Sequence, residues 1–390
     1  MKPRFIIVSF EPIGPSEGRA IGKITYGLCD YLHKNGEDVV YYVINKGRFT
    51  TSFPSESVHW LTRYLLYLLD IVFRLNIFKS SFRRNVEEWM FDYFLSSRKL
   101  EGDYLLTTSP FISRTLKKHK HKFRKTFLLP ANPNESTIAA LYKKEFARYQ
   151  VTAKYDDAYC NPFRVRQFRK SIPYIDSIIA ISQVTGRSYL PEQKEIIHVP
   201  YVFIPKNKPQ DAIPKQENTP VRFLYVAYSV PLKGLHRLLQ EWRLADLKDA
   251  ELHIVGDIGS EYAAAFDLSG SDNVHFIGPV FPPTKQFMEC DIVVIPSLLD
   301  NEPTTAIEAL LYEKLVIIST GCGYADLIDS FVTEAVYNID TDNALAEKLR
   351  FFAANLPQLK EKFKPAFNYV RNNNFDINAF YEKIKITMAG

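Results

Sequence analysis

The feature that most constrains the fold of this 390-residue chain is a set of ten short apolar runs. Stretches with helical patterning separate these runs. Each run consists mainly of Val, Ile, Leu and Phe and does not alternate strictly with polar residues. Such runs are typical of a parallel sheet whose two faces are both covered by helices. The runs form two series, at residues 5–9, 39–43, 104–107, 126–129 and 177–181, and at residues 222–226, 251–255, 274–277, 292–295 and 315–319.

The two series predict two domains, because residues 204–220 between them are rich in proline and polar residues and read as a linker. The chain is also long for a single core. We therefore expect an α/β protein with two doubly wound, Rossmann-like parallel-sheet domains that face each other across a cleft. The expected boundaries are an amino-terminal domain at 1–204, a linker at 205–220, a carboxy-terminal domain at 221–370, and a final helix at 371–390 that packs back on the first domain.

Neither a secretory leader nor a membrane-spanning helix is recognisable in the sequence. The most apolar stretch, residues 60–78, is interrupted by Arg63, Asp70 and Arg74. The four cysteines are scattered, which argues against a disulfide framework or a cysteine-based zinc site and indicates a reducing compartment. We therefore expect a cytoplasmic protein.

Positive charge is concentrated in the front half, where residues 1–200 contain 31 Lys and Arg against 19 Asp and Glu. Residues 113–125 include seven of these basic side chains, and residues 64–84 mix apolar, aromatic and basic side chains. Such stretches are usually solvated faces or core. The alternative is a peripheral contact with the inner face of an anionic membrane. No nucleic-acid-binding module is recognisable, so we expect no nucleic-acid partner.

A phosphate-binding helix start is predicted behind the run at 292–295. Pro303 suits the first position of a helix, where its missing N–H has no cost. The free N–H groups around Thr304 and Thr305 then point out of the carboxyl edge of the sheet. A phosphate is favoured there by hydrogen bonds and by the helix dipole, and open α/β sheets bind ligands at this edge.

Three carboxylates surround this helix start, at Asp300, Glu302 and Glu308. Because a carboxylate accepts two or more hydrogen bonds, it is suited to recognising the diols of a sugar or a ribose. The simpler explanation is that acids near the first helical turn are favoured by the helix dipole alone.

A second element at the same edge consists of a strand, a short loop with Lys233 and Gly234, and a helix. Lysine can act there as a point charge on a diphosphate, and glycine lets the backbone approach closely. Lys-Gly pairs are also common in surface turns. Two further glycine-bearing strand exits, at 252–262 and 273–281, are expected at this edge.

Together these segments resemble the retaining nucleotide-sugar glycosyltransferases of the GT-B fold, in glycosyltransferase family four. The matching motifs occur in the family's order: LKG, HIVGD, VHFIG, IPSLLDNEPTTAIEAL and VIISTGCG. Each motif is weak alone, but the set covers essentially the whole back half. The front half matches mainly in layout, through an early glycine loop and the stretch IDSIIAIS.

This resemblance implies roles for individual residues. Lys233 holds the donor diphosphate, Asp300 contacts the donor sugar hydroxyls, and Glu308 binds the ribose hydroxyls; these three are the candidate catalytic residues. The backbone near Pro279 and Val280 holds the base. The other donor-binding candidates are Gly14, Gly18, Tyr228, Gly234, Glu302, Thr304 and Thr305.

The chain also departs from the family's pattern. Tyr228 stands where an arginine usually shares the diphosphate, and Glu313 or Lys314 replaces a glycine at the end of the helix. The front-half histidine near the acceptor is absent, and Asn132 and Glu135 are the acceptor-side candidates in its place. The loop of Gly14 and Gly18 lacks the spacing of a dinucleotide-binding turn.

The expected activity is transfer of a sugar from a nucleoside-diphosphate donor to a hydroxyl of a polysaccharide or lipid-linked glycan. The nucleotide sugar is a co-substrate. No further cofactor and no metal is expected, because lysine and N–H groups supply the positive field. The alternatives are a nucleotide-sugar epimerase of the same fold and a non-catalytic member that binds a sugar nucleotide or glycan; a dehydrogenase is more distant.

Overall fold

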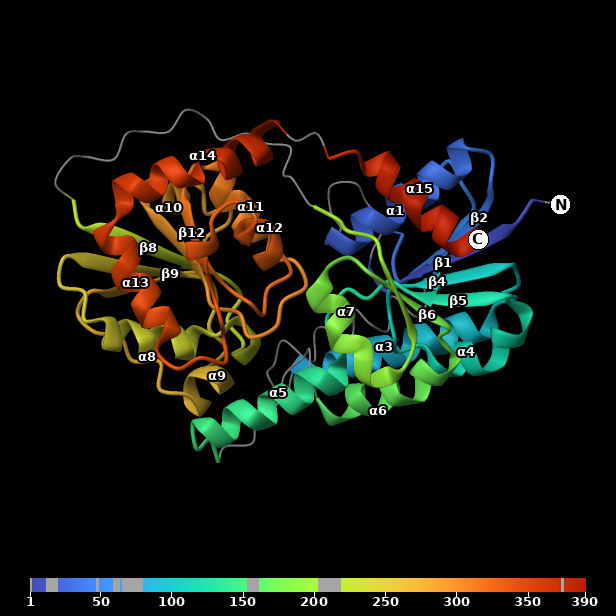
Figure 1. Ribbon diagram of the computed structural model, residues 1–390. Coiled ribbons are helices and arrows are strands. Elements are labelled where there is room, and N and C mark those ends of the chain that lie inside the picture. Colours follow the sequence, from blue (N-terminus) through green and yellow to red (C-terminus); the bar gives the residue numbers. More distant parts are fainter. Residues whose placement is uncertain are drawn as a thin grey trace. The chain divides into compact units, whose positions relative to one another are not determined.

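The computed structural model folds into two compact units (Figure 1). It describes residues 2–11, 20–46, 49–58, 64, 80–152, 161–202, 219–372 and 375–390. Unit 1 comprises Met1–Ala140, Asp156–Tyr201 and Asp376–Gly390, and unit 2 comprises Leu141–Tyr155 and Val202–Phe375.

Unit 1 is built on a sheet of seven strands in the order β3-β2-β1-β4-β5-β6-β7, and every neighbouring pair is parallel. The five strands predicted in the front half are all present. Edge strands β3 and β7 were not predicted, because β3 is the polar tripeptide Ser-Glu-Ser and β7 is partly exposed. The strands are β1 (Arg4–Ser9), β2 (Asp38–Val43), β3 (Ser55–Ser57), β4 (Tyr104–Thr107), β5 (Lys125–Leu128), β6 (Ser177–Ala180) and β7 (Glu195–His198).

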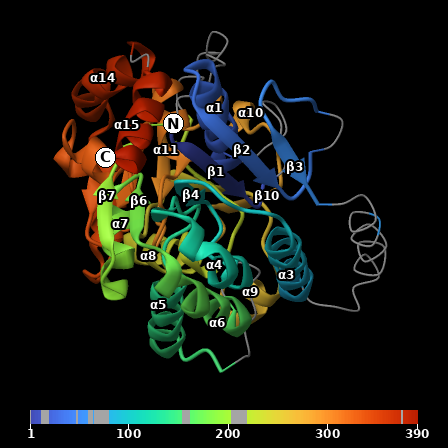
Figure 2. The ribbon, with the colours of Figure 1, turned by 90° about the vertical axis from the view of Figure 1, so that its right-hand side faces the viewer.

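Helices cover both faces of this sheet, as its buried central strands require (Figures 1 and 2). One face carries α1 (Ala20–Lys34) and the carboxy-terminal helix α15 (Ile377–Ala389), which pack closely because Gly27 of α1 leaves room for the Tyr381 ring. The hydroxyl of Tyr31 also donates a hydrogen bond to Glu382, at 2.7 Å. The other face carries α3 (Ser80–Ser97), α4 (Ser113–His119) and α6 (Pro162–Ser171), and α7 (Gln183–Tyr189) follows β6.

Unit 2 is built on a second sheet, with six parallel strands in the order β10-β9-β8-β11-β12-β13. All five strands predicted in the back half are present, and two-residue β13 was too short to predict. The strand order reverses between β8 and β11, which makes this a topological switch point. The strands are β8 (Val221–Val226), β9 (Ala250–Val255), β10 (Val274–Gly278), β11 (Ile292–Ile295), β12 (Leu315–Ser319) and β13 (Val336–Tyr337).

The helices of unit 2 also form two layers (Figure 1). One layer contains α8 (Leu235–Ala245) and α13 (Ala344–Ala354); the other contains α10 (Thr284–Glu289), α11 (Thr304–Leu311) and α14 (Leu356–Asn372). The short helices α9 (Ser260–Ala265) and α12 (Ala325–Asp329) lie between strands in the chain. Trp242 of α8 is 2% exposed and packs edge to face on Phe223 of β8, so it anchors its helix to the sheet.

The first domain was expected to include all residues up to 204, but residues 141–155 belong to unit 2 in the structure. Helix α5 (Glu135–Arg148) begins in unit 1, and its last part belongs to unit 2. Phe146 packs on Phe266 with ring centroids 5.7 Å apart, and Tyr149 packs on His236 at 4.9 Å. These aromatic contacts join residues distant in sequence, which is why composition did not reveal the boundary.

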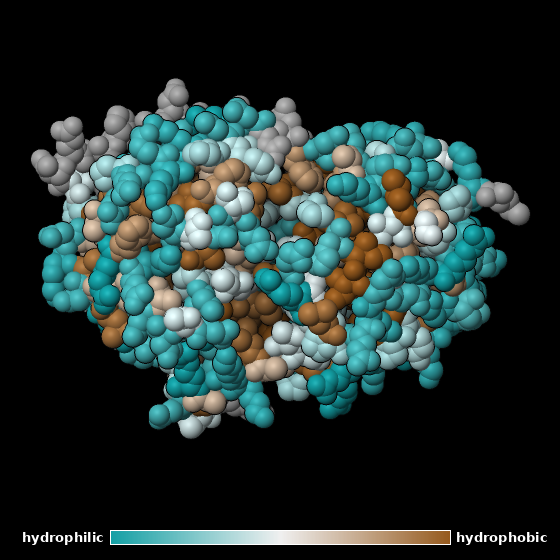
Figure 3. Space-filling view, viewed as in Figure 1, coloured by the Kyte–Doolittle hydropathy of each residue, from teal (hydrophilic) through white to brown (hydrophobic). Residues whose placement is uncertain are grey.

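Hydrophilic side chains cover most of the face drawn in Figure 3, and apolar side chains appear between them in patches. Among the described residues, no helix has the length and apolar character needed to cross a membrane. Most of the predicted membrane-facing stretch 64–84 lies outside the described residues, whereas 113–125 is described in full.

Candidate active site

A pocket of about 290 Å³ opens at the carboxyl ends of β8 and β11, at the switch point of the unit 2 sheet. Ligands of open α/β folds bind at such points because two loops diverge there. The pocket is lined by Tyr225, Val226, Ala227, Tyr228, Lys233, Val294, Ile295, Pro296, Ser297, Asp300, Glu302, Pro303, Thr304 and Thr305.

The loop after β8 brings Lys233 to this pocket through a short 3-10 turn, Pro231–Lys233. Gly234 follows with φ +70°, a left-handed conformation that favours glycine. A Cβ atom at Gly234 would lie 2.0 Å from the carbonyl oxygen of Pro296, so only glycine lets the loop approach the end of β11. The structure therefore gives Gly234 a packing role in bringing the Lys233 loop close to Pro296.

Asp300 meets Lys233 across the pocket. The Asp300 backbone is fixed because its N–H donates to the Gly321 carbonyl at 2.9 Å and its carbonyl accepts from the Gly323 N–H at 2.9 Å. Its Oδ2 accepts hydrogen bonds from Lys233 Nζ at 2.5 Å and from Ser297 Oγ at 3.4 Å. The side chains of Lys233 and Asp300 are 32% and 13% exposed, so the ion pair is partly shielded from water.

Helix α11 begins at Thr304, and Pro303 is its N-cap rather than its first helical residue. The prediction for Pro303 was wrong by one position, because its ψ of 98° is extended and its carbonyl accepts the Ala306 N–H at 2.9 Å. Thr304 and Thr305 occupy the first turn, where backbone N–H groups have no helical partner. Both residues line the pocket, so the positive end of the helix dipole faces it.

Glu302 is the most perturbed carboxyl group of the pocket. Burial, and then the negative charge of Asp300, hold the pKa of Glu302 well above its usual range. Its Oε1 is buried and has no hydrogen-bond partner among the described residues. The neutral, protonated form of Glu302 is therefore favoured, and this carboxyl group can donate as well as accept a hydrogen bond.

Glu308 lies one helical turn beyond Thr304, on the same side of α11. Its side chain is half-buried, and burial raises its pKa. Glu308 is not among the residues that line the pocket, so the structure brings it beside the wall and not into it.

The remaining donor-side predictions fall in different places. Tyr228 lines the pocket and is 53% exposed. Pro279 and Val280 follow β10, and neither is a lining residue of this pocket. Gly14 and Gly18 lie outside the described residues.

The acceptor-side candidates Asn132 and Glu135 both line a small cavity of about 30 Å³ in unit 1. Arg164, only 2% exposed, pairs with Glu135 at 3.5 Å and also with Glu88. Burial raises the pKa of Glu135 to about 7, against the opposing positive charge of Arg164. The cavity therefore has a charged, buried wall with room for about one water molecule.

Sequence reasoning missed two polar residues beside the Lys233–Asp300 pair. Ser297 lines the pocket and donates to Asp300. Asn301 is 6% exposed, and neither its amide nitrogen nor its amide oxygen has a hydrogen-bond partner among the described residues. The only sequence signal for either residue was its position between the end of a predicted strand and a carboxylate.

Comparisons with known proteins bear on the family and the fold. Residues 206–366 match the family model for glycosyl transferases group 1. No curated protein sequence matches the chain significantly. Among solved structures, the chain is similar to WaaG, a glycosyltransferase involved in lipopolysaccharide biosynthesis, with a TM-score of 0.62 and 15% identity over 99% of this chain and 100% of the other.

Two further solved structures share the fold. Sucrose-phosphate synthase from Thermosynechococcus elongatus aligns with a TM-score of 0.64 and 15% identity over 98% of both chains. HepE from Anabaena, in complex with UDP, aligns with a TM-score of 0.58 and 13% identity over 99% of both chains. The fold is therefore that of the GT-B glycosyltransferases, as predicted.

Proposed function

We propose that this protein, whose residues 206–366 match the family model for glycosyl transferases group 1, is a glycosyltransferase that transfers a sugar with retention of configuration. The donor is a nucleoside-diphosphate sugar. The acceptor is a hydroxyl of a polysaccharide or lipid-linked glycan.

The observation that carries this proposal is the position of Lys233, 2.5 Å from Asp300, in a pocket that also faces the start of α11. A lysine and the N–H groups of Thr304 and Thr305 form a preorganised positive field. Such a field stabilises the charge that develops on a departing diphosphate. Because these groups supply the field, we propose that transfer requires no metal.

Each carboxyl group near the pocket has a separate part in binding the rest of the donor. Asp300 carries the negative charge that holds Lys233 at the pocket, and its oxygens can accept hydrogen bonds from sugar hydroxyls. Glu302 in its neutral form adds no negative charge against the diphosphate. Glu308 reaches the ribose hydroxyls from the next turn of α11. Tyr228, at the exposed side of the pocket, covers the donor.

The donor is the part of this proposal with a direct analogue, because HepE was crystallised with UDP and with UDP-glucose. A thermal-shift panel of nucleoside diphosphates and their sugars identifies the base, since a ligand that binds only the folded state raises Tm by mass action. Failure of every nucleoside diphosphate to raise Tm would remove the basis for the donor pocket.

The reaction itself is tested by incubating the protein and the identified donor with and without a glycan acceptor. Transfer requires acceptor, and the product should keep the anomeric configuration of the donor. An epimerase would instead release altered sugar without acceptor. Tight donor binding with neither transfer nor hydrolysis would identify a non-catalytic protein.

On the acceptor side we propose that Asn132 and Glu135 contact the incoming hydroxyl, and that unit 1 rests on an anionic membrane. Four basic residues of 113–125 are already paired with acids, which weakens the positive field of this stretch. Trp89 and Tyr93 of α3 are more than half exposed and stack at 5.9 Å, with the Arg114 guanidinium 5.3 Å from the Tyr93 ring. Exposed aromatic rings beside a cation are typical of a membrane interface.

A further inference from the structure

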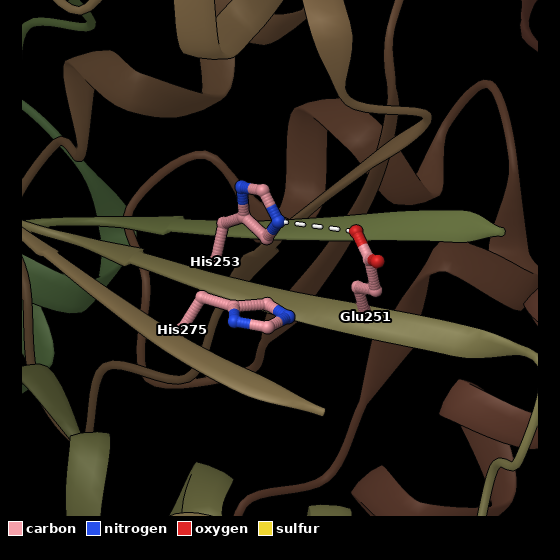
Figure 4. Close-up of side chains that lie close together, drawn as sticks. All are labelled: Glu251, His253 and His275. Atoms are coloured by element: carbon pink, nitrogen blue, oxygen red, sulfur yellow. Dashed lines mark hydrogen bonds and ion pairs between the residues drawn. The ribbon is translucent and has the colours of Figure 1, made fainter. Parts of the chain in front are cut away.

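Two histidines and one glutamate form a separate cluster on the outer strands of unit 2 (Figure 4). Glu251 and His253 belong to β9, and His275 belongs to the edge strand β10. We propose that these three side chains bind a divalent transition metal of the zinc class, at a site apart from the donor pocket. Imidazole and carboxylate are ligands that Zn²⁺ accepts in sites with two histidines and one glutamate.

The sheet register places all three side chains on one face. Residues 251 and 253 alternate with buried Leu252, so both point to the same side of β9. His275 is the direct register partner of His253, which makes its side chain the nearest neighbour on that side. Figure 4 shows the three side chains on the same side of the two strands, with a ring nitrogen of each histidine turned toward the carboxylate.

The distances are close to those of a metal site. One ligand atom from each residue lies within 4.8 Å of the others, and His253 Nε2 lies 3.3 Å from Glu251 Oε2. Ligand atoms around a tetrahedral Zn²⁺ with bonds of about 2.0–2.1 Å are separated by about 3.4 Å. His253 and Glu251 already have that separation, and a ligand atom of His275 lies within 4.8 Å of both. A water molecule completes four-coordination.

The electrostatic surroundings favour ligation at neutral pH. Burial, and then the positive charge of Arg222, lower the pKa of His253, so its imidazole is neutral and available to a metal. Burial opposes ionisation of Glu251, but hydrogen bonding from His253 and the charge of Arg222 hold its pKa below the usual range. The Arg222 guanidinium lies 3.3 Å from Glu251 and 3.5 Å from Glu289 of α10. It can orient the ligating carboxylate while Glu289 balances its charge.

Solvent can reach this site, because the His253 and Glu251 side chains are 16% and 27% exposed. None of the three residues lines the donor pocket. A bound ion would cross-link β10, whose other edge has no strand partner in the described sheet, to β9. Edge strands are the least constrained strands of a sheet, so we assign the ion a stabilising role.

The test uses the full-length, tag-free protein after dialysis against a chelator. Titration calorimetry with Zn²⁺ should show one site per chain, and Co²⁺ should give the visible absorption of a four-coordinate complex. At a free Zn²⁺ concentration of about a hundred times Kd, the Tm should rise by about 5–10 °C. Binding should weaken as the pH falls, because protons compete with the metal for its ligands.

Variants His253→Ala and His275→Ala each remove a metal ligand. Loss of a residue that only hydrogen-bonds to a ligand typically weakens metal binding by roughly 10–100-fold, so each variant should weaken Zn²⁺ binding by more than that. His121→Ala, which removes an exposed histidine of unit 1, is the matched control and should bind as the parent does. Each variant's Tm without metal reports whether it is folded. The absence of a one-to-one site in the parent, or equal Zn²⁺ affinity in His275→Ala and the parent, would overturn the proposal and leave an ordinary hydrogen-bonded cluster.

Discussion

Lys233 Nζ lies 2.5 Å from Asp300 Oδ2, although the two residues are 67 positions apart in the sequence. Each was expected to contact a different part of the donor, and the structure joins them in one ion pair. The pair explains how a cation is held at a pocket with several carboxyl groups. A diphosphate that enters can share Lys233 with Asp300, so the field needs little reorganisation.

Replacing Lys233 by Ala should lower kcat/KM for sugar transfer by about a hundredfold or more, because it removes a charge aimed at the departing diphosphate. It also leaves Asp300 as a negative charge facing that group. Since the pair is partly exposed, the fold should survive. Initial rates of donor consumption and a thermal melt measure the two effects.

Lys285→Ala is the control, because Lys285 is a lysine of the same unit, on α10, that is also paired with an acid. Its side chain is 77% exposed and lies 3.8 Å from the exposed carboxylate of Glu289. It should retain full activity. Rates for Lys233→Ala within about twofold of the parent would refute the role of this lysine.

Glu308→Ala should raise the apparent Kd for a nucleoside diphosphate by about 10–100-fold, as loss of a charged hydrogen-bond acceptor for ribose hydroxyls predicts. Titration calorimetry measures this value. The diagnostic comparison is the 2′,3′-dideoxy form of the same diphosphate, which the parent should bind as weakly as the variant binds the natural ligand. Glu361→Ala, at an exposed site of α14, is the control. Equal loss of affinity for both ligands in Glu308→Ala would point to a structural effect.

Glu302→Gln should stabilise the protein at alkaline pH. The folded pKa of Glu302 is raised, so the folded state binds more protons than the unfolded state between the unfolded value of about 4.3 and the folded value. Stability is therefore lost as the pH rises through that window. Glutamine carries no charge and removes this loss.

Thermal melts of the parent and Glu302→Gln between about pH 5 and pH 9 measure the difference. As the pH rises, the Tm of the variant should become a few degrees higher than that of the parent. At the acidic end of the range the two Tm values should converge. A constant difference at all pH values would mean that Glu302 does not titrate in this range.

The sheets could be predicted because their strands are defined by local patterns. Runs such as 292–295 and 315–319 match β11 and β12 at both ends, since every residue in them is buried. Strands β3 and β13 could not be predicted, because a pair or triplet of residues has no periodicity and is stabilised by its neighbour.

The sequence predicted several of the residues that line the pocket but not the contacts between them. Sequence order indicated that Lys233, Asp300 and Thr304 would meet at one edge. It could not show that Lys233 pairs with Asp300 or that Gly234 packs on Pro296, because both contacts depend on how two loops fold against each other. The cluster of Glu251, His253 and His275 had a usable signal, since His253 and His275 each lie three residues before a glycine at the end of a predicted strand.

Vesicles test the proposed membrane contact. The protein should sediment with vesicles rich in anionic lipid at low salt, and less so at about 0.5 M salt because the charge contribution is screened. Replacing both Trp89 and Tyr93 by Ala should reduce binding several-fold by removing the exposed aromatic pair. Leu190→Ala, also an exposed apolar residue of unit 1, should bind normally. Equal sedimentation with neutral and anionic vesicles would contradict an electrostatic contact.

The stability of unit 2 should depend on Glu145, because this carboxylate is fully buried and accepts hydrogen bonds from two basic side chains. Its carboxylate accepts hydrogen bonds from Arg237 Nε at 2.9 Å and from His236 Nε2 at 3.2 Å. Removing one partner of a buried ion pair leaves the other charge uncompensated. Glu145→Ala should therefore lower the free energy of unfolding by about 3–5 kcal/mol.

Lys144→Ala is a matched control on the same helix, because Lys144 and Asp340 form an ion pair at 2.8 Å with both side chains more than 60% exposed. Its loss should change the free energy of unfolding by about 0–1 kcal/mol. Urea unfolding followed by tryptophan fluorescence compares the two variants with the parent. A loss below about 1 kcal/mol for Glu145→Ala would mean that Arg237 finds water or another acceptor.

Acid titration separates this charge effect from simple packing. Burial opposes ionisation, but the hydrogen bonds from His236 and Arg237 lower the pKa of Glu145 to about 2. Because the folded pKa lies below the unfolded value of about 4.3, the stabilisation is complete above that value and disappears as the pH falls toward 2. The parent should lose stability across this window and Glu145→Gln should lose less. Parallel curves for the two proteins would assign the destabilisation to lost packing instead of lost charge.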